Sequence, residues 1–294
     1  MPHSPEQQGF VPEDAREGEH RFSSTPEAMQ KGAERVVDMA TKAFQVDGQE
    51  RIEALRQERQ ENPDQRFVIT GSHLSNLDVP AAVKVLGRDF NMQVAPESVL
   101  FGLTAQQIVM NIAGRENFTP LEYKKRKGGG KMGVFNPDNF DALGETMEEG
   151  RTPWIAIHPM TTDGKMKHAR VGPVFLAHKT GSRVIPTALE VRGGSISFEG
   201  IAELAKGFAK KVDATYHVGS SIELEPVDIA PLEDVLRKRG RGEKITKEEL
   251  AAFKETHRRL QEQADRIGET IAAMLPEEHR GVYAKEEAAD KKIK

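Results

Sequence analysis

Residues 66–83 read RFVITGSHLSNLDVPAAV. The apolar run Phe-Val-Ile at 67–69, bounded by turn residues, predicts a buried strand. A Gly-Ser pair ends that strand, and Asp78 followed by Pro80 predicts a helix with Asp78 as its N-cap. His73 is therefore expected on a strand-to-helix turn, five residues before a carboxylate at the start of a helix.

A histidine that faces a carboxylate can serve as a general base. The carboxylate accepts a hydrogen bond from one ring nitrogen and fixes the tautomer, and the other nitrogen can take a proton from a hydroxyl. On a regular helix, five residues would place the two side chains about 140° apart. His73 and Asp78 face one another only if the turn folds back, as its composition favours. The alternative is a capping Asp78 and a surface His73 without chemistry, but active sites of open α/β sheets lie at the carboxyl ends of strands.

Composition limits the class of protein. The 294 residues suffice for one large or two small domains, and a net charge of −4 implies no general affinity for nucleic acid. The absence of cysteine excludes disulfides, thiolate zinc sites and a cysteine nucleophile, and it fits a reducing compartment. No stretch approaches about 18 consecutive apolar residues, and the polar N-terminus lacks the apolar core of a signal peptide. We expect a cytoplasmic protein that reaches any lipid from the water side, as a peripheral protein on the inner face of the membrane.

The remaining pattern predicts an α/β fold with a mixed central sheet flanked by helices and a helical N-terminal extension. We expect the following organisation: a flexible tail at 1–25, the helical extension at 26–62, an α/β domain at 63–276 that includes a C-terminal helix, and a charged tail at 277–294 that is loose. Within the extension, one helix is expected from Thr25 to Gly48 and a second to about Glu61.

Further elements follow from apolar periodicity and turn residues. Strands are expected at 91–95, 152–157, 183–191, 195–198 and 214–218, and helices at 78–86, 138–149, 172–177 and 231–239. Thr246 and Glu249 form a capping box for the last helix, whose apolar stripe docks on the body with His257 packed at the core edge. The apolar segment 96–114 is either core or the lining of an acyl-chain tunnel.

Two basic regions could contact a phosphate. The loop YKKRKGGGK at 123–131 is either a contact for a phosphate or an anionic lipid, or a solvated loop. The second region follows the strand at 152–157 and carries Lys165, Lys167 and Arg170 before a helix start. Basic side chains and helix amides at the carboxyl end of a strand suit a phosphate.

The segment GSHLSNLDVPAA at 71–82 resembles the His-x4-Asp signature of the glycerolipid acyltransferases, which include lysophosphatidate and glycerol-3-phosphate acyltransferases. The resemblance extends over residues 66–227. Later residues fall in the order of the family's second motif and the strand after it: Pro159, Thr162, Asp163-Gly164, Arg170, Gly172 and Val184-Ile185-Pro186. Met160 and Thr161 replace the family's Glu-Gly, its Arg-Ser is missing, and residues 133–137 lack its arginine.

The resemblance implies transfer of a fatty acyl group from acyl-CoA or acyl carrier protein to a hydroxyl of glycerol 3-phosphate or lysophosphatidate, in phospholipid biosynthesis. His73 would deprotonate the hydroxyl and Asp78 would orient His73, without an acyl-enzyme and without a cofactor other than the acyl donor as co-substrate. The residues expected to bind substrate are Ser75, Asn76, Thr162, Lys165, Lys167 and Arg170.

Three alternatives stay open. The lost Glu-Gly and arginine allow an acyltransferase with a different, non-glycerolipid acceptor. A non-catalytic protein that binds lipid or acyl carrier protein has no chemical need for an intact His-Asp pair. A nucleotide-binding protein would need a glycine fingerprint that this chain lacks. We expect no metal site, because His158 and His168 lack HExxH-type spacing, and we expect His158, at a usually aromatic position of the family, to pack.

Overall fold

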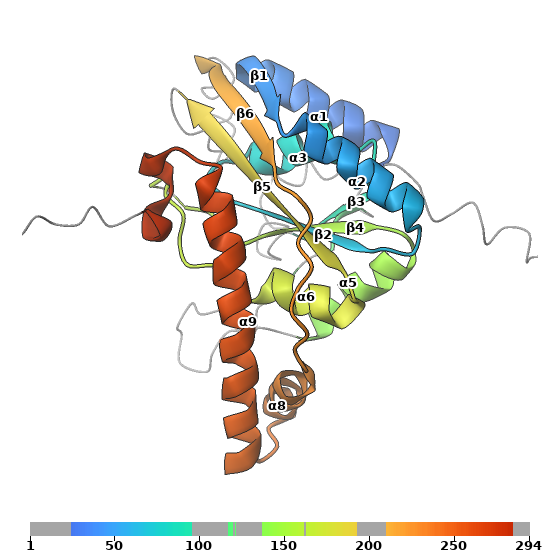
Figure 1. The fold of residues 1–294 in the computed structure, drawn as a ribbon, viewed down its shortest axis with the longest axis vertical. Helices are drawn as coiled ribbons and strands as arrows, with labels where there is room; N and C mark the ends of the chain where they lie inside the picture. The colour runs from blue at the N-terminus through green and yellow to red at the C-terminus, as the bar shows by residue number, and fades with distance from the viewer. Residues whose placement is uncertain are drawn as a thin grey trace, which may run out of the picture.

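The computed structural model describes residues 25–95, 117–119, 121, 137–161, 163–192 and 210–284. Within this part of the chain, six strands form one sheet in the order β1-β6-β5-β2-β4-β3 (Figure 1). The strands are β1 (Thr41–Asp47), β2 (Phe67–Gly71), β3 (Met92–Val94), β4 (Thr152–Ala156), β5 (Arg183–Arg192) and β6 (Val212–Val218). Only β5 and β6 pair antiparallel. The expected mixed central sheet is therefore confirmed.

Helices cover both faces of this sheet. They are α1 (Glu27–Ala40), α2 (Gln49–Glu61), α3 (Asp78–Leu86), α5 (Pro137–Glu148), α6 (Gly172–Thr180), α8 (Ala230–Arg241) and α9 (Lys247–Ala273), followed by short 3-10 turns η5 (Glu277–His279) and η6 (Gly281–Tyr283). Phe67 and Ile69 of β2 pack with α1, α2 and α3, whereas Val68 packs with α5, α6 and α9. This period-two alternation makes β2 the centre of two cores.

The position of β2 fixes where the turn with His73 begins. All five residues of β2 are buried, and parallel neighbours flank it on both sides, β5 and β4. A Cβ at Gly71 would lie 2.7 Å from the hydroxyl of Thr187, so glycine allows β5 to approach closely at this point. The turn therefore leaves the middle of the sheet at the carboxyl end of a central strand.

The N-terminal extension differs from its predicted helical form. The first helix ends at Ala40 rather than Gly48, and residues 41–47 form the edge strand β1, which pairs parallel with β6. Phe44 and Val46 pack against the same apolar cluster as α1. Pairing with β6 satisfies the backbone of this segment, and a helix-compatible pattern cannot reveal a partner about 170 residues away in the chain.

The last helix follows its predicted start but not all of its predicted packing. The capping box of Thr246 and Glu249 is present. The C-terminal half of α9 is buried against the body, whereas His257 is exposed and stacks on Phe253 at a ring-centroid distance of 6.1 Å. The packed position of His257 was wrong because the N-terminal half of α9 extends beyond the sheet, where α8 is the neighbouring helix among the described residues (Figure 1).

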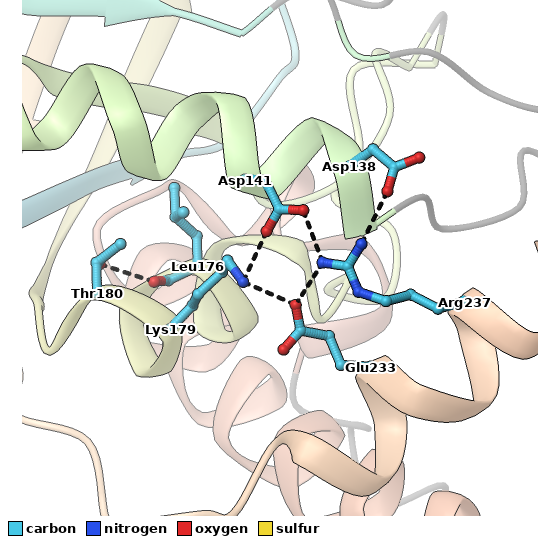
Figure 2. A network of polar contacts seen from close by, with 7 residues as sticks. All are labelled: Asp138, Asp141, Leu176, Lys179, Thr180, Glu233 and Arg237. Carbon is cyan, nitrogen blue, oxygen red and sulfur yellow. Dashed lines mark hydrogen bonds and ion pairs between the residues drawn. The ribbon is translucent and has the colours of Figure 1, made fainter.

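An ion-pair network joins three helices on the α9 side (Figure 2). Lys179 of α6 lies 2.8 Å from Asp141 of α5 and 2.7 Å from Glu233 of α8. Arg237 of α8 contacts the same two carboxylates, at 2.6 and 3.1 Å, and also Asp138 at 3.0 Å. Because each charge has at least one partner on another helix, the network fixes how α5, α6 and α8 sit relative to one another.

The other expected elements are present where the structure describes them. The strands expected at 91–95, 152–157, 183–191 and 214–218 are β3, β4, β5 and β6. The segment 96–114, the basic loop 123–131, the strand expected at 195–198 and Thr162 lie outside the described residues. In the described part of the chain, no helix combines the length and apolar character that crossing a membrane requires.

Candidate active site

The turn between β2 and α3 brings His73 and Asp78 into contact. The Nδ1 of His73 lies 3.1 Å from Oδ2 of Asp78. The same carboxylate oxygen accepts a hydrogen bond from the Ser75 amide at 2.8 Å, and the Asp78 amide donates to the Ser75 carbonyl at 3.2 Å. The turn therefore folds back as its composition predicted, and the two side chains face one another.

Asp78 is the first residue of α3 rather than its N-cap, which is Leu77. The N-cap prediction was wrong because the carboxylate points back to the turn, where it accepts from Ser75 and contacts His73, instead of bonding to the first helical amides. Pro80 lies in the first turn of the helix, as expected. The carboxylate thus holds the histidine and the turn with one oxygen.

The chemistry of the pair follows from its burial. Asp78 is 2% exposed, and burial raises the pKa of its carboxyl above the usual range, against the hydrogen bonds from His73 and the Ser75 amide, which lower it. When the carboxylate is ionised it can only accept hydrogen bonds, so in that state Nδ1 of His73 is the donor and Nε2 has a free lone pair. The His73 side chain is 21% exposed. This arrangement suits a general base whose reactive nitrogen is Nε2.

Trp154 of β4 completes the surroundings of His73, and the sequence reasoning missed it. Its ring lies edge-to-face with the imidazole at a centroid distance of 5.9 Å. Trp154 pairs with Ile69 of β2 in the sheet register, so the strand beside β2 places it under the turn. The signal available was a single tryptophan in a predicted strand, which gave no partner for it.

The second predicted region, the loop at 158–170, lies directly against the His73 turn. The Thr161 amide donates to the His73 carbonyl at 3.2 Å, and the Ile157 amide donates to the Gly71 carbonyl at 2.9 Å. The loop returns to the end of β4, where the Arg170 amide donates to the Ile157 carbonyl at 2.7 Å. Two segments about 90 residues apart in the chain therefore share one edge of the sheet.

The basic side chains of this loop are exposed. Lys167 lies 2.6 Å from Asp163, so its charge already has a partner. Lys165 and Arg170 have no ion-pair partner among the residues that the structure describes. These two are therefore available to an anionic ligand on this loop.

The predicted substrate residues on the first turn have other visible contacts. Ser75 is buried, and its hydroxyl accepts a hydrogen bond from the Leu77 amide at 3.2 Å. Asn76 is partly buried on the same turn. The contacts of Ser75 stabilise the turn that carries His73.

His158 packs beside the site, as expected from the sequence. It is 1% exposed, and its Nδ1–H donates to the Pro159 carbonyl at 2.8 Å. Burial lowers the pKa of His158 to about 4, and the positive charges of Arg170 and Lys167 act in the same direction. His158 is therefore neutral at physiological pH. No group of three or more potential metal ligands occurs in the described part of the chain.

Comparison with known proteins was made at the level of family models, curated proteins and solved structures. No protein-family model matches the chain, and no curated protein matches it. Among solved structures, it is similar to the 1-acyl-sn-glycerophosphate (LPA) acyltransferase PlsC from Thermotoga maritima, with a TM-score of 0.44 and 15% sequence identity. The match covers 81% of this chain and 78% of that one.

Proposed function

We propose that the protein is an acyltransferase that moves a fatty acyl group from a thioester, acyl-CoA or acyl carrier protein, to a hydroxyl of a glycerol-phosphate acceptor. The observation that carries the proposal is the contact of Nδ1 of His73 with the buried Asp78 carboxylate, which leaves Nε2 as a base at the carboxyl end of a central strand. The His-x4-Asp spacing resembles that of the glycerolipid acyltransferases.

In the proposed reaction, Nε2 of His73 removes the proton from the acceptor hydroxyl while Asp78 stabilises the imidazolium that forms. The oxygen attacks the thioester carbonyl, and a tetrahedral intermediate forms. Collapse of this intermediate breaks the carbon–sulfur bond, and the leaving thiolate takes the proton back from His73. The products are an ester and a free thiol, and no acyl-enzyme is involved.

The acceptor phosphate would bind at the loop that follows β4. Arg170 and Lys165 are exposed and carry charges without a partner among the described residues, and the loop contacts the His73 turn through Thr161. Lys167 would contribute less, because Asp163 already neutralises it. A bidentate guanidinium contact to a phosphate would fix the distance between the acceptor hydroxyl and His73.

Mass spectrometry of reaction products tests this function. The protein is incubated with palmitoyl-CoA, oleoyl-CoA or acyl carrier protein donors, each with glycerol 3-phosphate or lysophosphatidate. We expect an acylated product that is lost in His73→Ala and kept in His257→Ala, a matched control at an exposed histidine in the N-terminal half of α9. Failure of every donor and acceptor pair, or product formation by His73→Ala, would contradict the proposal.

A second acceptor class is favoured by one observation. Met160 is 37% exposed and lies next to Thr161, whose amide bonds to the His73 turn, at the position where the family has an acidic residue. An exposed thioether on the loop that contacts the His73 turn suits an apolar part of an acceptor better than a polar part that would need a hydrogen bond. A competition experiment with glycerol 3-phosphate and an apolar alcohol or amine in the same reaction distinguishes the two acceptor classes. If the acceptor is not a glycerolipid, the acylated alcohol or amine should be the main product.

A further inference from the structure

The loop that carries Arg170 is contacted by the segment that follows α9. Residues 277–284, here called the C-terminal strap, contain η5 and η6 and were expected to be part of a loose tail. Instead they pair with the loop through its backbone. The Met166 amide donates to the His279 carbonyl at 2.9 Å, and the Val282 amide donates to the Met166 carbonyl at 3.2 Å.

We propose that the C-terminal strap positions the anion-binding loop, with Tyr283 as a positioning residue for Arg170. This inference rests on the proposed function for its substrate, but the contacts that support it do not depend on that function. These contacts involve the peptide group between Ala169 and Arg170 and the amide of Ala169 that precedes it.

Three elements hold the backbone around this peptide. The Ala169 amide donates to the hydroxyl of Tyr283 at 2.7 Å, and the Ala169 carbonyl accepts from the Gln261 side chain of α9 at 2.9 Å. The Arg170 amide donates to the Ile157 carbonyl of the β4 end. Because consecutive polar groups are fixed from the strap, from α9 and from the sheet, the direction in which the Arg170 side chain leaves the backbone is fixed as well.

The hydroxyl of Tyr283 is itself fixed on α9. It donates to Oδ1 of Asp265 at 3.0 Å, while its lone pairs face the Ala169 amide. The pKa of Tyr283 is raised to about 12, mainly because the phenol is partly buried. The hydroxyl therefore keeps its proton at neutral pH. Asp265 lies one helical turn from Gln261, so one face of α9 orients both the strap and the loop.

Two glycines allow the strap to come this close. Gly281 has φ +56, and a Cβ there would lie 2.0 Å from the Met166 carbonyl oxygen. A Cβ at Gly268 of α9 would lie 2.6 Å from the hydroxyl of Tyr283. Both positions therefore require the absence of a side chain for the contacts that hold the loop.

Tyr283→Phe tests the proposal with two measurements, one of activity and one of the loop. The ring stays in place, but the Ala169 amide and Asp265 lose their common partner. We expect the KM for glycerol 3-phosphate to rise about tenfold with kcat within about twofold, because the loop would bind the acceptor less well while His73 and Asp78 stay in place. We also expect faster tryptic cleavage after Lys165, Lys167 and Arg170, mapped by mass spectrometry.

Thr256→Val is the matched control. Thr256 lies on α9, and its hydroxyl donates to the Asp228 carbonyl at 3.3 Å, away from the loop. The Thr256→Val variant loses one hydroxyl from α9, the helix that contacts Tyr283. It should leave both the KM and the cleavage of the loop unchanged. Unchanged values for Tyr283→Phe, or equal changes in both variants, would overturn the proposal. If the wild-type protein acylates no phosphorylated acceptor, the proposed function fails, and the cleavage rates alone then decide whether the strap holds the loop.

Discussion

The two turns that form the site are built in different ways. The facing arrangement of His73 and Asp78 is set by contacts within residues 72–78, between Ser75, Asp78 and His73 itself, while Thr161 adds one backbone hydrogen bond from the neighbouring loop. The loop at 158–170 is instead held by β4, α9 and the C-terminal strap, elements that lie up to about 115 residues away in the chain. The base is therefore assembled locally, whereas the group proposed to bind the acceptor is assembled by tertiary contacts.

This difference indicates that the two functions can be damaged separately. A change in the first turn affects the proton transfer and leaves the loop in place. A change in α9 or the strap affects where Arg170 points and leaves His73 and Asp78 in contact. Each of the following predictions uses this separation, and they run from the largest expected effect to the smallest.

Asp78→Asn should abolish most of the activity while the protein stays folded. An amide cannot hold His73 in the tautomer with a free Nε2 or stabilise the imidazolium, so kcat should fall about 10³–10⁴-fold. The KM for the acceptor should change little, because Asp78 does not contact the loop. Steady-state kinetics and circular dichroism measure both, and a tenfold rise in KM with kcat unchanged would show that the two turns are not independent.

Gly281→Ala should undock the strap. The added methyl group would meet the Met166 carbonyl, and alanine is strained at φ +56, so we expect a loss of about 2–4 kcal/mol in the free energy of unfolding. Gly242→Ala is the control, because Gly242 has φ +72 but no atom within 4 Å of an added Cβ. It should cost only about 1 kcal/mol from backbone strain. Equal losses in urea unfolding would mean that the strap does not pack as closely as described.

His158 should make the protein less stable in mild acid. Its folded-state pKa of about 4 lies below its ordinary value of 6.5, so between these pH values the unfolded chain binds the extra proton. The free energy of unfolding should therefore fall as the pH is lowered through this window, by about 2 kcal/mol between pH 7 and pH 5. In His158→Phe this contribution should be missing, and denaturant unfolding at both pH values measures the difference. An identical acid loss in both proteins would contradict it.

Arg170→Ala should give the smallest of these effects on function. We expect the KM for glycerol 3-phosphate to rise about tenfold from the loss of one charged contact, with kcat nearly unchanged. Lys167→Ala should change the KM less, because Asp163 already pairs with Lys167. A larger effect for Lys167 than for Arg170 in steady-state kinetics would move the proposed phosphate contact toward the tip of the loop.

Much of the first turn could be read from the sequence. The apolar run of β2, the helix start at Asp78 and the turn composition are local signals, and they predicted both the facing pair and its place at the end of a strand. The capping box of α9 was predicted for the same reason. The N-cap role of Asp78 was predicted wrongly, because Leu77 is the N-cap and the Asp78 carboxylate bonds back to the turn instead of to the first amides of the helix.

The rest depended on partners distant in the chain. β1 reads as part of a helix until β6 is beside it, and residues 277–284 read as a charged tail until the loop at 163–170 provides backbone partners. His257 fits the apolar stripe of the last helix, but it is exposed because the N-terminal half of α9 extends beyond the sheet. The sequence by itself determined β2, α3 and the His73–Asp78 pair, because short-range sterics and hydrogen bonds encode them. Only the tertiary structure decided where Arg170 lies, because its backbone is fixed by groups that folding alone brings together.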